Sequence, residues 1–593
     1  MLRLHCCTYG HTHLLSCLSC FFFLVRQPGA LSPAFLSRFP AHNHRHKMEH
    51  ACVSSLRVLW LTLLPAVLIC VLLFSYLWTI LWLKPERIRQ RLRRQGVKGP
   101  KPSLLLGNIP EMRRVQKQLA ESDHQEQQEA AAGGSHRFSS NYMTALFPYF
   151  HHWNRVYGSI YLYSTGNIQS LFVTDPDMVK ELANCKSLNL GKPRYLQKQL
   201  GALLGTGILT ANGDLWAHQR KVIAPHFFMD KVKGMVDLMA ESANEMLVSW
   251  EDIVDRGGGT AEVVVDEFLR NFSADVISRV AFGSRFSEGK EIFSKIRQLQ
   301  VAMAKQDIFA ALPGSRYLPT QRNREIQKLS ASIRDLILDI ARRHEEEHDD
   351  PPATSSASSS DGLLRSIVEG AKAAAGAFSS CTAEDFIVDN CKNIYFAGHE
   401  TTSTTAAWCL MLLASHPEWQ SRARAEVLEV RRQQGQKPVD ADTIRKLKTV
   451  AMVVQETLRL YPPAPFVTRE ALRDVTLGGL HVPSGTGVRV PIALAHRDPA
   501  AWAAGGEPDG FDPGRFANGV AGACRPPHMY MPFGVGARTC AGQNLAVVEI
   551  KVVLALLLPR FELALSPGYV HRPAFRLTVE PGSGVALVLK KLC

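Results

Sequence analysis

The chain has 593 residues, a formal net charge of +14 at pH 7 and 46% hydrophobic residues. With 21% charged residues, this is the composition of a globular protein, which excludes a mostly disordered or fibrous chain. The length allows several domains or one large domain with additional segments, and a core that needs neither disulfides nor structural metals. The net charge by itself would suggest binding to nucleic acid or to an anionic membrane.

The positive charge is concentrated near the N-terminus. The first 101 residues contain 14 of the 68 Lys and Arg residues but only two of the 54 Asp and Glu residues, so +12 of the +14 lies there. The rest of the chain is nearly neutral. This distribution argues against a nucleic-acid-binding protein.

An apolar segment explains the clustering. Residues 58–83 contain no charged side chain, and as a helix these 26 residues would span about 39 Å, more than the roughly 30 Å of a bilayer core. A buried core helix is the alternative, but few such helices are this long and apolar on every face. Because the Lys and Arg residues follow the segment, the C-terminal portion is expected in the cytosol. We predict a transmembrane signal-anchor over 56–84.

The leader before this segment allows several interpretations. Residues 1–47 contain no acidic side chain, and their apolar run from Leu14 to Val25 is too short to span a bilayer. An organelle transit peptide or a cleavable signal peptide has these properties. Alternatively, translation begins at Met48 and the leader has no role.

The remainder predicts a single domain that is mainly α with small β-sheets (α+β). Residues 85–110 are basic and Pro-rich and are typical of a hinge. The segment 160–176 alternates and turns as a β-hairpin does, whereas helical periodicity dominates from about residue 214. Short strands with Pro/Gly-rich connections are expected from 461 to 530. We assign 111–593 to this domain.

Cysteine usage fits a cytosolic body, and one cysteine differs from the others. The seven cysteines after residue 101 contain no CxxC pair, which argues against a disulfide framework or a zinc ribbon. Cys540, however, lies in a glycine-rich loop directly before a strongly apolar helix, with Arg538 on the same loop. Backbone N–H groups and a helix N-terminus stabilise a thiolate. From the residues alone, Cys540 could be a nucleophile or an axial metal ligand.

The spacing in this loop adds a family resemblance. Phe533, Gly536, Arg538, Cys540 and Gly542 reproduce the pattern FxxGxRxCxG, so the sequence resembles the cytochrome P450 superfamily and its haem-thiolate loop. The resemblance implies the P450 fold, a haem b cofactor and Cys540 as the axial ligand of the iron. It also implies that Phe533 and Arg538 bind haem. Most relatives carry Pro where this chain has Ala537, a difference that leaves the ligand cysteine intact.

A second motif, FAGHETT, lies midway along an apolar stretch over 382–415. Gly398 and a threonine that can bind the carbonyl one turn back both distort a helix locally. By resemblance, this distortion makes room for dioxygen above the iron. The hydroxyl of Thr401 and the carboxyl of Glu400 would then supply protons to it.

A third motif has a structural role by resemblance. Glu456 and Arg459 are three residues apart and share a helix face. In the P450 family this pair is buried and bound by a later arginine, which corresponds to Arg515. We expect the three residues to hold the haem-binding core together without taking part in the chemistry.

Three further residues are implied to bind the haem propionates. Trp216 and Arg220 are four residues apart, so that the indole N–H and the guanidinium can bind one anion together. Arg469 matches another propionate-binding arginine of the family, beside Arg538. A generic surface arginine is the alternative for Arg469.

Within the superfamily, residues 55–593 look like plant microsomal enzymes. They are most similar to the gibberellin 13-hydroxylases and the 16,17-epoxidising gibberellin-deactivating enzymes. This implies a monooxygenase on the endoplasmic reticulum membrane that receives electrons from the NADPH-dependent P450 reductase, because the chain has no dinucleotide fingerprint of its own. A gibberellin or related diterpenoid is the expected substrate, with a brassinosteroid, a triterpenoid or a cytokinin-like hormone as alternatives. The pocket residues that we expect to choose the substrate are Ala397, Pro465, Phe466 and Val467.

Three rival readings remain at this point. A family member that rearranges oxygenated lipids without dioxygen often lacks the acid–threonine pair present here. A membrane-anchored haem-binding protein without turnover would keep Cys540 but would not need Glu400 and Thr401. A cysteine hydrolase would need neither haem nor a reductase.

Overall fold

The computed structural model describes residues 64–118, 141–283, 286–304, 318–349, 362–379, 381–502 and 506–592. The chain divides into two compact units, Met1–Thr79 and Ile80–Cys593. The predicted leader over 1–47 and residues 56–63 of the predicted anchor lie outside the described residues.

The described part of the predicted anchor is helical. Leu64–Arg93 forms a helix of 30 residues that is long and apolar enough to cross a membrane, and its apolar part is not buried in the protein. The helix widens to a π-helical turn at Thr79–Leu83 and continues as α3, Lys84–Arg93. An N-terminal membrane helix is therefore consistent with the predicted anchor.

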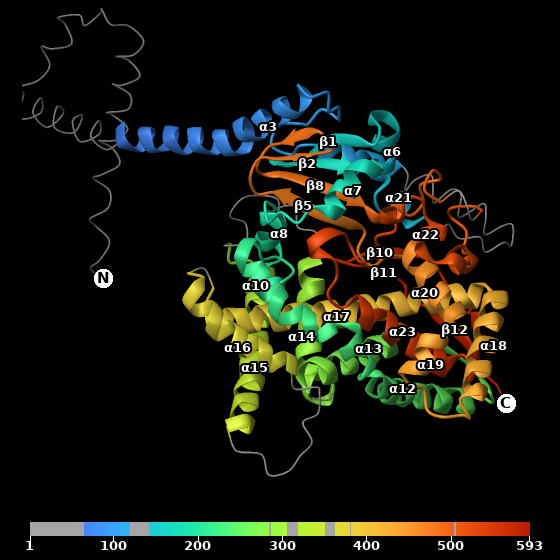
Figure 1. Cartoon of the computed structure of the whole chain (residues 1–593). Helices are drawn as coiled ribbons and strands as arrows, with labels where there is room; N and C mark the ends of the chain where they lie inside the picture. Colours follow the sequence, from blue (N-terminus) through green and yellow to red (C-terminus); the bar gives the residue numbers. More distant parts are fainter. Residues whose placement is uncertain are drawn as a thin grey trace, which may run out of the picture. The chain divides into compact units, whose positions relative to one another are not determined.

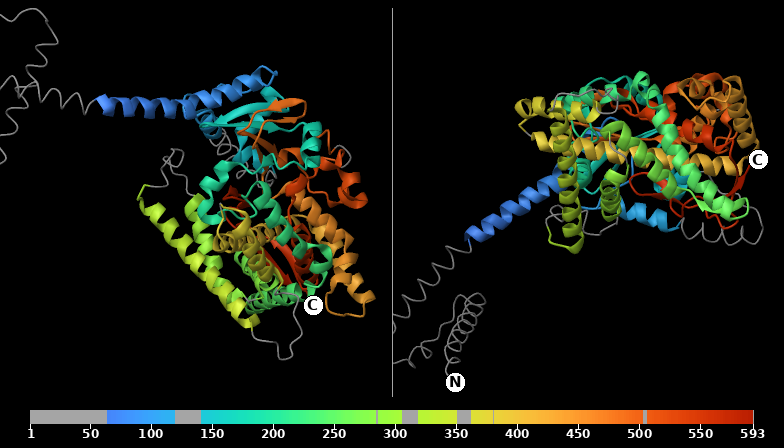
Figure 2. Two further views of the ribbon diagram at one scale, coloured as in Figure 1. Left: turned by 60° about the vertical axis from the view of Figure 1, so that its left-hand side comes forward. Right: turned by 90° about the horizontal axis from the view of Figure 1, so that it is seen from below.

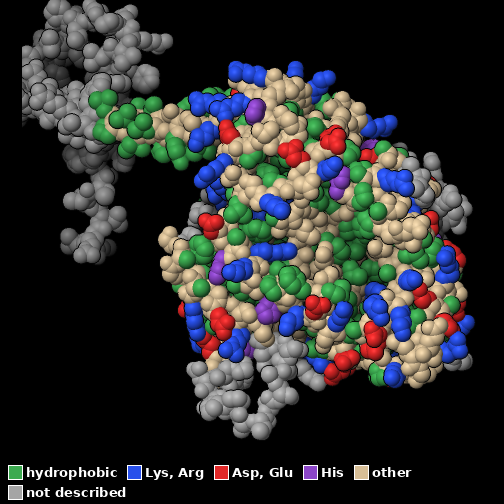
Figure 3. Space-filling model, viewed as in Figure 1, with side chains coloured by type: hydrophobic (Ala, Val, Ile, Leu, Met, Phe, Trp, Pro, Cys, Tyr) green, Lys and Arg blue, Asp and Glu red, His purple; other side chains and the backbone are tan. Residues whose placement is uncertain are grey.

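The segment that follows is packed onto the second unit, unlike a free hinge. Leu92 of α3 is fully buried, and the buried Arg89 donates from Nη1 to Gln169 Oε1 at 3.3 Å. After α3, isolated bridges join Lys98 to Tyr161 and Gly107 to the same hairpin. Lys and Arg side chains gather on the surface over α3 (Figure 3). The Gly and Pro content of 85–110 indicated a hinge but carried no sign of these buried contacts.

A five-stranded sheet forms one side of the second unit. Its order is β1-β2-β8-β5-β3, with β2 and β8 parallel and the other pairs antiparallel. The predicted hairpin over 160–176 is confirmed as β1 and β2, which turn at Gly166 with a φ of 62°. The strands of this sheet are β1 (Ile160–Thr165), β2 (Ile168–Val173), β3 (Leu190–Gly191), β5 (Phe466–Ala471) and β8 (Thr486–Pro491).

Helices make up most of the second unit (Figure 1). The sheet lies at one end of this unit and the long helices at the other, with α17 running through the helical part (Figures 1 and 2). The principal helices are α6 (Pro148–Tyr157), α7 (Pro176–Asn184), α8 (Arg194–Gln199), α10 (Gly213–Ile223), α12 (Val236–Arg256), α13 (Asp266–Phe282), α14 (Phe286–Ala304), α15 (Gln321–Asp349), α16 (Gly362–Ala377), α17 (Ala383–Ser415), α18 (Pro417–Gln433), α19 (Ala441–Lys446), α20 (Lys448–Leu460) and α23 (Gln543–Leu557).

Three smaller sheets complete the unit. They pair β4 (Thr260–Val264), β12 (Ala586–Lys591) and β9 (Phe561–Leu565), then β6 (Val475–Leu477) with β7 (Leu480–Val482), and β10 (Pro573–Phe575) with β11 (Val579–Pro581). The prediction of a mainly α fold with small sheets is confirmed.

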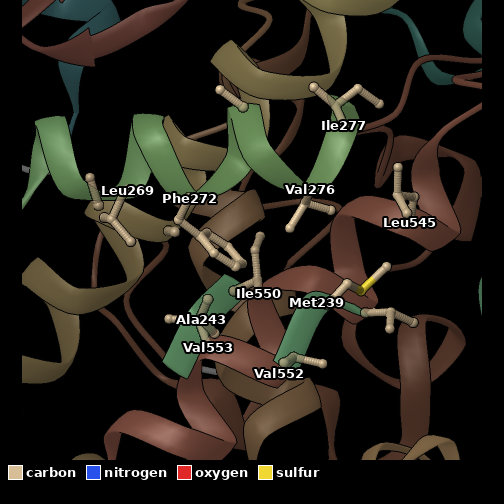
Figure 4. Packing of buried hydrophobic residues seen from close by; sticks show 14 of the residues in the cluster. Met239, Ala243, Leu269, Phe272, Val276, Ile277, Leu545, Ile550, Val552 and Val553 are labelled. Carbon is tan, nitrogen blue, oxygen red and sulfur yellow. The ribbon is translucent and has the colours of Figure 1, made fainter. Parts of the chain in front are cut away.

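The main core lies between the helices that carry the predicted motifs. Phe272 of α13 points between α12 and α23, where it meets Ala243 and Ile550 (Figure 4). Both α13 and α23 also pack against α17. The helix that follows Cys540 and the helix that carries Thr401 are therefore held by one core.

Truncation of Phe272 to Ala should destabilise the protein by about 3–5 kcal/mol, because the ring is 4% exposed and its removal leaves a cavity. The matched change Phe228→Ala removes a ring that is 57% exposed and should have little effect. Thermal unfolding of the detergent-solubilised full chain measures both. Equal shifts in the two variants would contradict this account of the core.

Candidate active site

The loop that carries Cys540 is closed by its own backbone. The Cys540 N–H donates to the Phe533 carbonyl at 2.9 Å, and α23 begins three residues after the cysteine. Gly536 has a φ of 71°, and a Cβ at this position would lie 3.0 Å from the Leu182 carbonyl oxygen. Glycine therefore allows the loop to turn tightly against α7.

Cys540 is an exposed residue of this loop. Its side chain keeps accessible surface, yet burial raises its pKa, while the Gly542 N–H and the Arg220 guanidinium act in the opposite direction. A bound metal cation would reverse this balance, because a coordinating thiol is deprotonated outright. Cys540 is thus placed as a metal ligand more readily than as a free nucleophile.

Two of the predicted haem-binding arginines hold the cysteine loop. Arg220 Nη1 donates to the Thr539 carbonyl at 2.7 Å, directly before Cys540. The Arg538 guanidinium stacks on the Trp216 ring, with 4.2 Å from Cζ to the ring centroid. Arg538 Nη2 binds backbone near α10, but its Nη1 is buried without a partner.

Two further cations lie beside them. Arg469 donates to the Val535 carbonyl at 2.9 Å, and with Trp216 and Arg538 it lines one hollow behind the cysteine loop. Lys192 lies close enough to Arg469 and Arg538 for repulsion to affect its titration. Burial and these two neighbours lower the pKa of Lys192 to about 7. Burial also lowers the pKa of Arg469 to about 10 and that of Arg538 to about 9.

This cluster fits an anionic ligand. Within the part of the chain that the structure describes, no carboxylate forms an ion pair with Lys192, Arg220, Arg469 or Arg538. A buried cation without a counter-charge is costly, and a bound carboxylate would relieve that cost. A flat metal complex with two carboxylates beside an accessible thiol satisfies both features. The residues present therefore fit haem.

The second predicted motif lies on α17, a single helix of 33 residues. Between residues 388 and 414, Ala397, Gly398 and Thr401 are partly exposed, whereas the other residues are buried. These positions share one face, because residues three and four apart lie above each other on a helix. The Thr401 hydroxyl donates to the Ala397 carbonyl at 2.7 Å, as predicted for the residue one turn back. We call this partly exposed side of an otherwise buried stretch the open face, and it lies at the predicted oxygen-binding position.

Glu400 points away from this open face. It is fully buried and accepts a hydrogen bond from Arg297 Nη1 of α14 at 3.0 Å, while Arg297 Nη2 reaches Glu580 of β11 at 3.2 Å. Burial acts to raise the pKa of Glu400, but the neighbouring His399 imidazole and Arg297 guanidinium outweigh it and lower the pKa. Glu400 and Thr401 are adjacent in sequence but face different neighbours.

The predicted pocket residues divide between two clusters. Phe466 is half-buried and its ring meets Phe147 at 5.2 Å between centroids, whereas Val467 is buried in the core of the large sheet. Successive side chains of a strand point to opposite faces, which explains the division. Pro465 is buried next to them, and its carbonyl accepts a hydrogen bond from Ile492 N.

The third motif forms a closed ion-pair network. Arg459 Nε and Nη2 bind the two carboxylate oxygens of Glu456 at 2.7 and 2.8 Å, and Arg515 Nε lies 3.4 Å from Glu456 Oε1. Arg459 also donates to the carbonyls of His496, Pro508 and Gly510. All the predicted partners of the triad meet, and they join α20 to the segment 496–515.

A histidine that carried no sequence signal extends this network. His496 accepts a hydrogen bond from Met531 N at Nε2, 2.9 Å away, so its Nδ1–H donates to the Arg459 carbonyl at 3.1 Å. His496 therefore links the triad to the start of the cysteine loop. Burial lowers its pKa to about 3, which keeps the ring neutral.

Lys192, Arg297 and Glu580 were also missed from the sequence. None belongs to a spaced motif, and each reaches its neighbours only through the tertiary fold. One local feature points to Arg297: the acidic residue of FAGHETT, Glu400, lies in an apolar stretch, and a buried carboxylate requires a cationic partner elsewhere in the chain.

Known proteins agree with this geometry. A family model described as Cytochrome P450 matches residues 136–586. A rice protein named cytochrome P450 714C2 (Oryza sativa subsp. japonica) is 68% identical over 533 residues, which cover 90% of this chain and 98% of that protein. Cytochrome P450 714D1 of rice is 47% identical, covering 89% and 94%. Cytochrome P450 714A2 of Arabidopsis thaliana is 42% identical, covering 84% and 93%.

The cysteine loop and the cation cluster fit the site of a haem-thiolate protein, and the family match makes the chain a cytochrome P450 monooxygenase. The chain belongs to the cytochrome P450 family, as the sequence predicts. Its relatives in this comparison are plant proteins whose names carry the number 714. Members of the family use haem and O2 and take electrons from a reductase partner, and thiolate ligation favours O–O cleavage.

Loss of Arg459 should be costly, because it leaves Glu456 buried without its main partner. We expect Arg459→Ala to destabilise the protein by about 3–5 kcal/mol and to lower the fraction that retains haem. Thermal unfolding and the haem-to-protein ratio measure this effect. Arg432→Ala is the matched control, since Arg432 forms the same i,i+3 pair with Glu429 on the exposed surface and should change neither quantity.

Acid should destabilise the protein through His496. Its pKa is about 3 in the folded chain against an ordinary value near 6.5, so the unfolded chain binds a proton that the folded chain does not. Its contribution to stability is therefore complete above about pH 6.5 and falls by about 1.4 kcal/mol per pH unit below it. Unfolding midpoints between pH 5 and 7 measure the slope. His496→Asn should flatten it, and an unchanged slope would exclude His496 as the cause.

Proposed function

We propose that this P450 hydroxylates or epoxidises a gibberellin or a related diterpenoid. The reaction class follows from family membership, and the substrate class is supported by the resemblance of residues 55–593 to gibberellin-oxidising plant enzymes. One observation carries the assignment of the site: an accessible Cys540 thiol on a loop flanked by four cations that form no ion pair with a carboxylate of the described residues. Bound haem would supply the centre at which O2 is activated.

The roles of the chain's own residues follow from their contacts. Cys540 would ligate the iron, and Arg220 would hold the loop at the Thr539 carbonyl. Lys192, Arg469 and Arg538 would bind the haem carboxylates, with the Trp216 ring supporting Arg538. Phe533, whose carbonyl closes the cysteine loop, would contact haem from that loop.

Proton supply would involve two faces of α17. The Thr401 hydroxyl lies on the open face, where it can hold a proton near the position of dioxygen. The Glu400 carboxyl, fixed by Arg297, lies behind it and would replenish that proton by rotation or through water. The ion-pair triad would have a structural role instead, because the side chains of Glu456, Arg459 and Arg515 bind one another.

The chain's organisation suits an enzyme held at a membrane. We infer that residues 56–84 anchor the protein in the endoplasmic reticulum membrane as a single span, with the domain over 111–593 in the cytosol. The same membrane would hold the NADPH-dependent P450 reductase. Residues 85–110 would connect the anchor to the domain while packing on its sheet.

The haem assignment is tested by the carbon monoxide difference spectrum of the reduced protein. We expect a red-shifted Soret band typical of thiolate ligation in the wild type and its loss in Cys540→Ser. Cys524→Ser is the matched control, because this buried cysteine lies outside the loop and its change should keep the band. A wild type without the band would refute the assignment.

The proton role of Thr401 is tested separately. Thr401→Ala should increase NADPH consumption per product formed, because the hydroxyl on the open face is lost. Thr405→Ala removes a hydroxyl with the same bond to a carbonyl one turn back, but from a buried position one turn further along α17, and should leave the coupling unchanged. Unchanged coupling in Thr401→Ala would remove the role from this residue.

The substrate class is tested with microsomes that contain the reductase. We expect oxygenated products from one or more members of a gibberellin panel, detected by mass spectrometry. Conversion of a brassinosteroid, a triterpenoid or a cytokinin in place of every gibberellin would overturn the substrate class and leave the reaction class intact.

A further inference from the structure

An arginine in the large sheet lacks an acidic partner. Arg489 lies on β8, where it pairs with Phe172 of β2 and Thr468 of β5. Its side chain is half-buried, and among the described residues no carboxylate forms an ion pair with it. Arginine stays charged at any physiological pH, so this guanidinium is a partly buried, uncompensated cation.

Glu470, an acidic residue on the same face of the sheet, is already paired with another residue. Glu470 follows Thr468 by two positions on β5 and therefore shares its face with Thr468. It accepts a hydrogen bond from the backbone N–H of Arg194 at 2.8 Å and lies 3.7 Å from the Arg194 guanidinium. This contact fixes the start of α8 and leaves Arg489 without a counter-charge.

Phenol and phenyl rings surround the guanidinium. Arg489 Nη2 donates to the Tyr195 hydroxyl of α8 at 3.0 Å, while its Nε is buried without a partner. The Phe466 ring lies 5.0 Å and the Tyr163 ring 5.9 Å from Cζ. Cation–π contacts stabilise the charge in part, but they do not use the remaining N–H donors of the Arg489 guanidinium.

The aromatic wall extends from this cation to the surface. Phe466 meets Phe147 at 5.2 Å, and Phe147 meets Phe575 at 5.5 Å, where the Phe575 ring is 43% exposed. Phe466 is also one of the residues expected from the sequence to line the substrate pocket. A guanidinium beside a row of packed aromatic rings that ends at the surface has the chemistry to bind a lipophilic molecule with a single carboxylate.

We propose that Arg489 and the Tyr195 hydroxyl bind the carboxylate of the substrate, and that they select a lipophilic acid over its neutral analogues. The inference rests on the proposed function and deepens it, because gibberellins are carboxylic acids. The guanidinium fork would donate two parallel hydrogen bonds to the carboxylate, and Tyr195 would donate a third once its oxygen binds Arg489. Phe466 would contact the apolar body.

The test is an equilibrium titration of the haem-loaded full chain with a monocarboxylic gibberellin and its methyl ester, followed by the substrate-induced spectral shift. In the wild type the acid should bind about tenfold or more tightly than the ester. Arg489→Gln should remove that preference by weakening the acid alone, and Arg489→Lys should restore part of it. Tyr195→Phe should weaken the acid by a few-fold.

Two controls keep the outcome interpretable. Arg422→Gln removes an arginine that stacks on Trp419 at 3.9 Å on the exposed surface of α18, and should leave both affinities unchanged. If Arg489→Gln fails to keep its carbon monoxide band, Tyr195→Phe and Arg489→Lys carry the test.

The possible failures are distinguishable. Equal binding of acid and ester to the wild type, or an unchanged preference in Arg489→Gln, would overturn the role of Arg489 while the gibberellin still binds. If no gibberellin shifts the spectrum, the proposed substrate class fails. The same titration with palmitic acid and its methyl ester then decides on Arg489, and a lack of preference for the acid there would overturn it as well.

Discussion

The constraint on which the rest of the site depends is the burial, near one cysteine, of cations that have no carboxylate partner among the described residues. Lys192, Arg469 and Arg538 repel one another, and burial already lowers the pKa of each. An apolar core would not retain such a group unless a ligand supplied the missing negative charge. The cluster therefore fits a ligand with two negative charges, which would supply the counter-charges that the described residues do not. The accessible thiol of Cys540 can bind a metal that the same ligand carries.

The surrounding fold keeps this arrangement rigid from two sides. On one side, Arg459 donates hydrogen bonds to Glu456 and to three carbonyls. His496 extends this network to Met531, which lies shortly before the cysteine loop. On the other, α17 is fixed by the core around Phe272 and by the Arg297 bridge from Glu400 to Glu580. The carboxylates of both networks are fully buried. Their desolvation is costly, but the hydrogen bonds that they accept hold the surrounding side chains in one arrangement. The open face at Thr401 is the exception in the otherwise buried stretch 388–414 of this helix.

The sequence predicted those parts of the molecule that depend on local spacing. The hairpin over 160–176, the long helix through FAGHETT, the Glu456–Arg459 pair and the loop of Cys540 all follow from residues close to one another in the chain. Contacts that join distant segments carry no local signal, and only the meeting of Arg515 with Glu456 was predicted, through the family resemblance. Arg297 and Glu400 are 103 residues apart, and Arg489 meets Tyr195 across 294 residues. The packing of α3 on the sheet was missed for the same reason, because nothing in the sequence distinguishes the buried Arg89 from the exposed basic residues around it.

The central claim is that the cations beside Cys540 are the haem-carboxylate site, and an experimental structure of the haem-loaded full chain tests it most directly. The account predicts a bond between Cys540 Sγ and the iron, and side-chain nitrogen atoms of Lys192, Arg469 and Arg538 within hydrogen-bond distance of the two haem carboxylates. A structure in which those carboxylates reach solvent, while acidic side chains of this chain pair with the three cations, would contradict it.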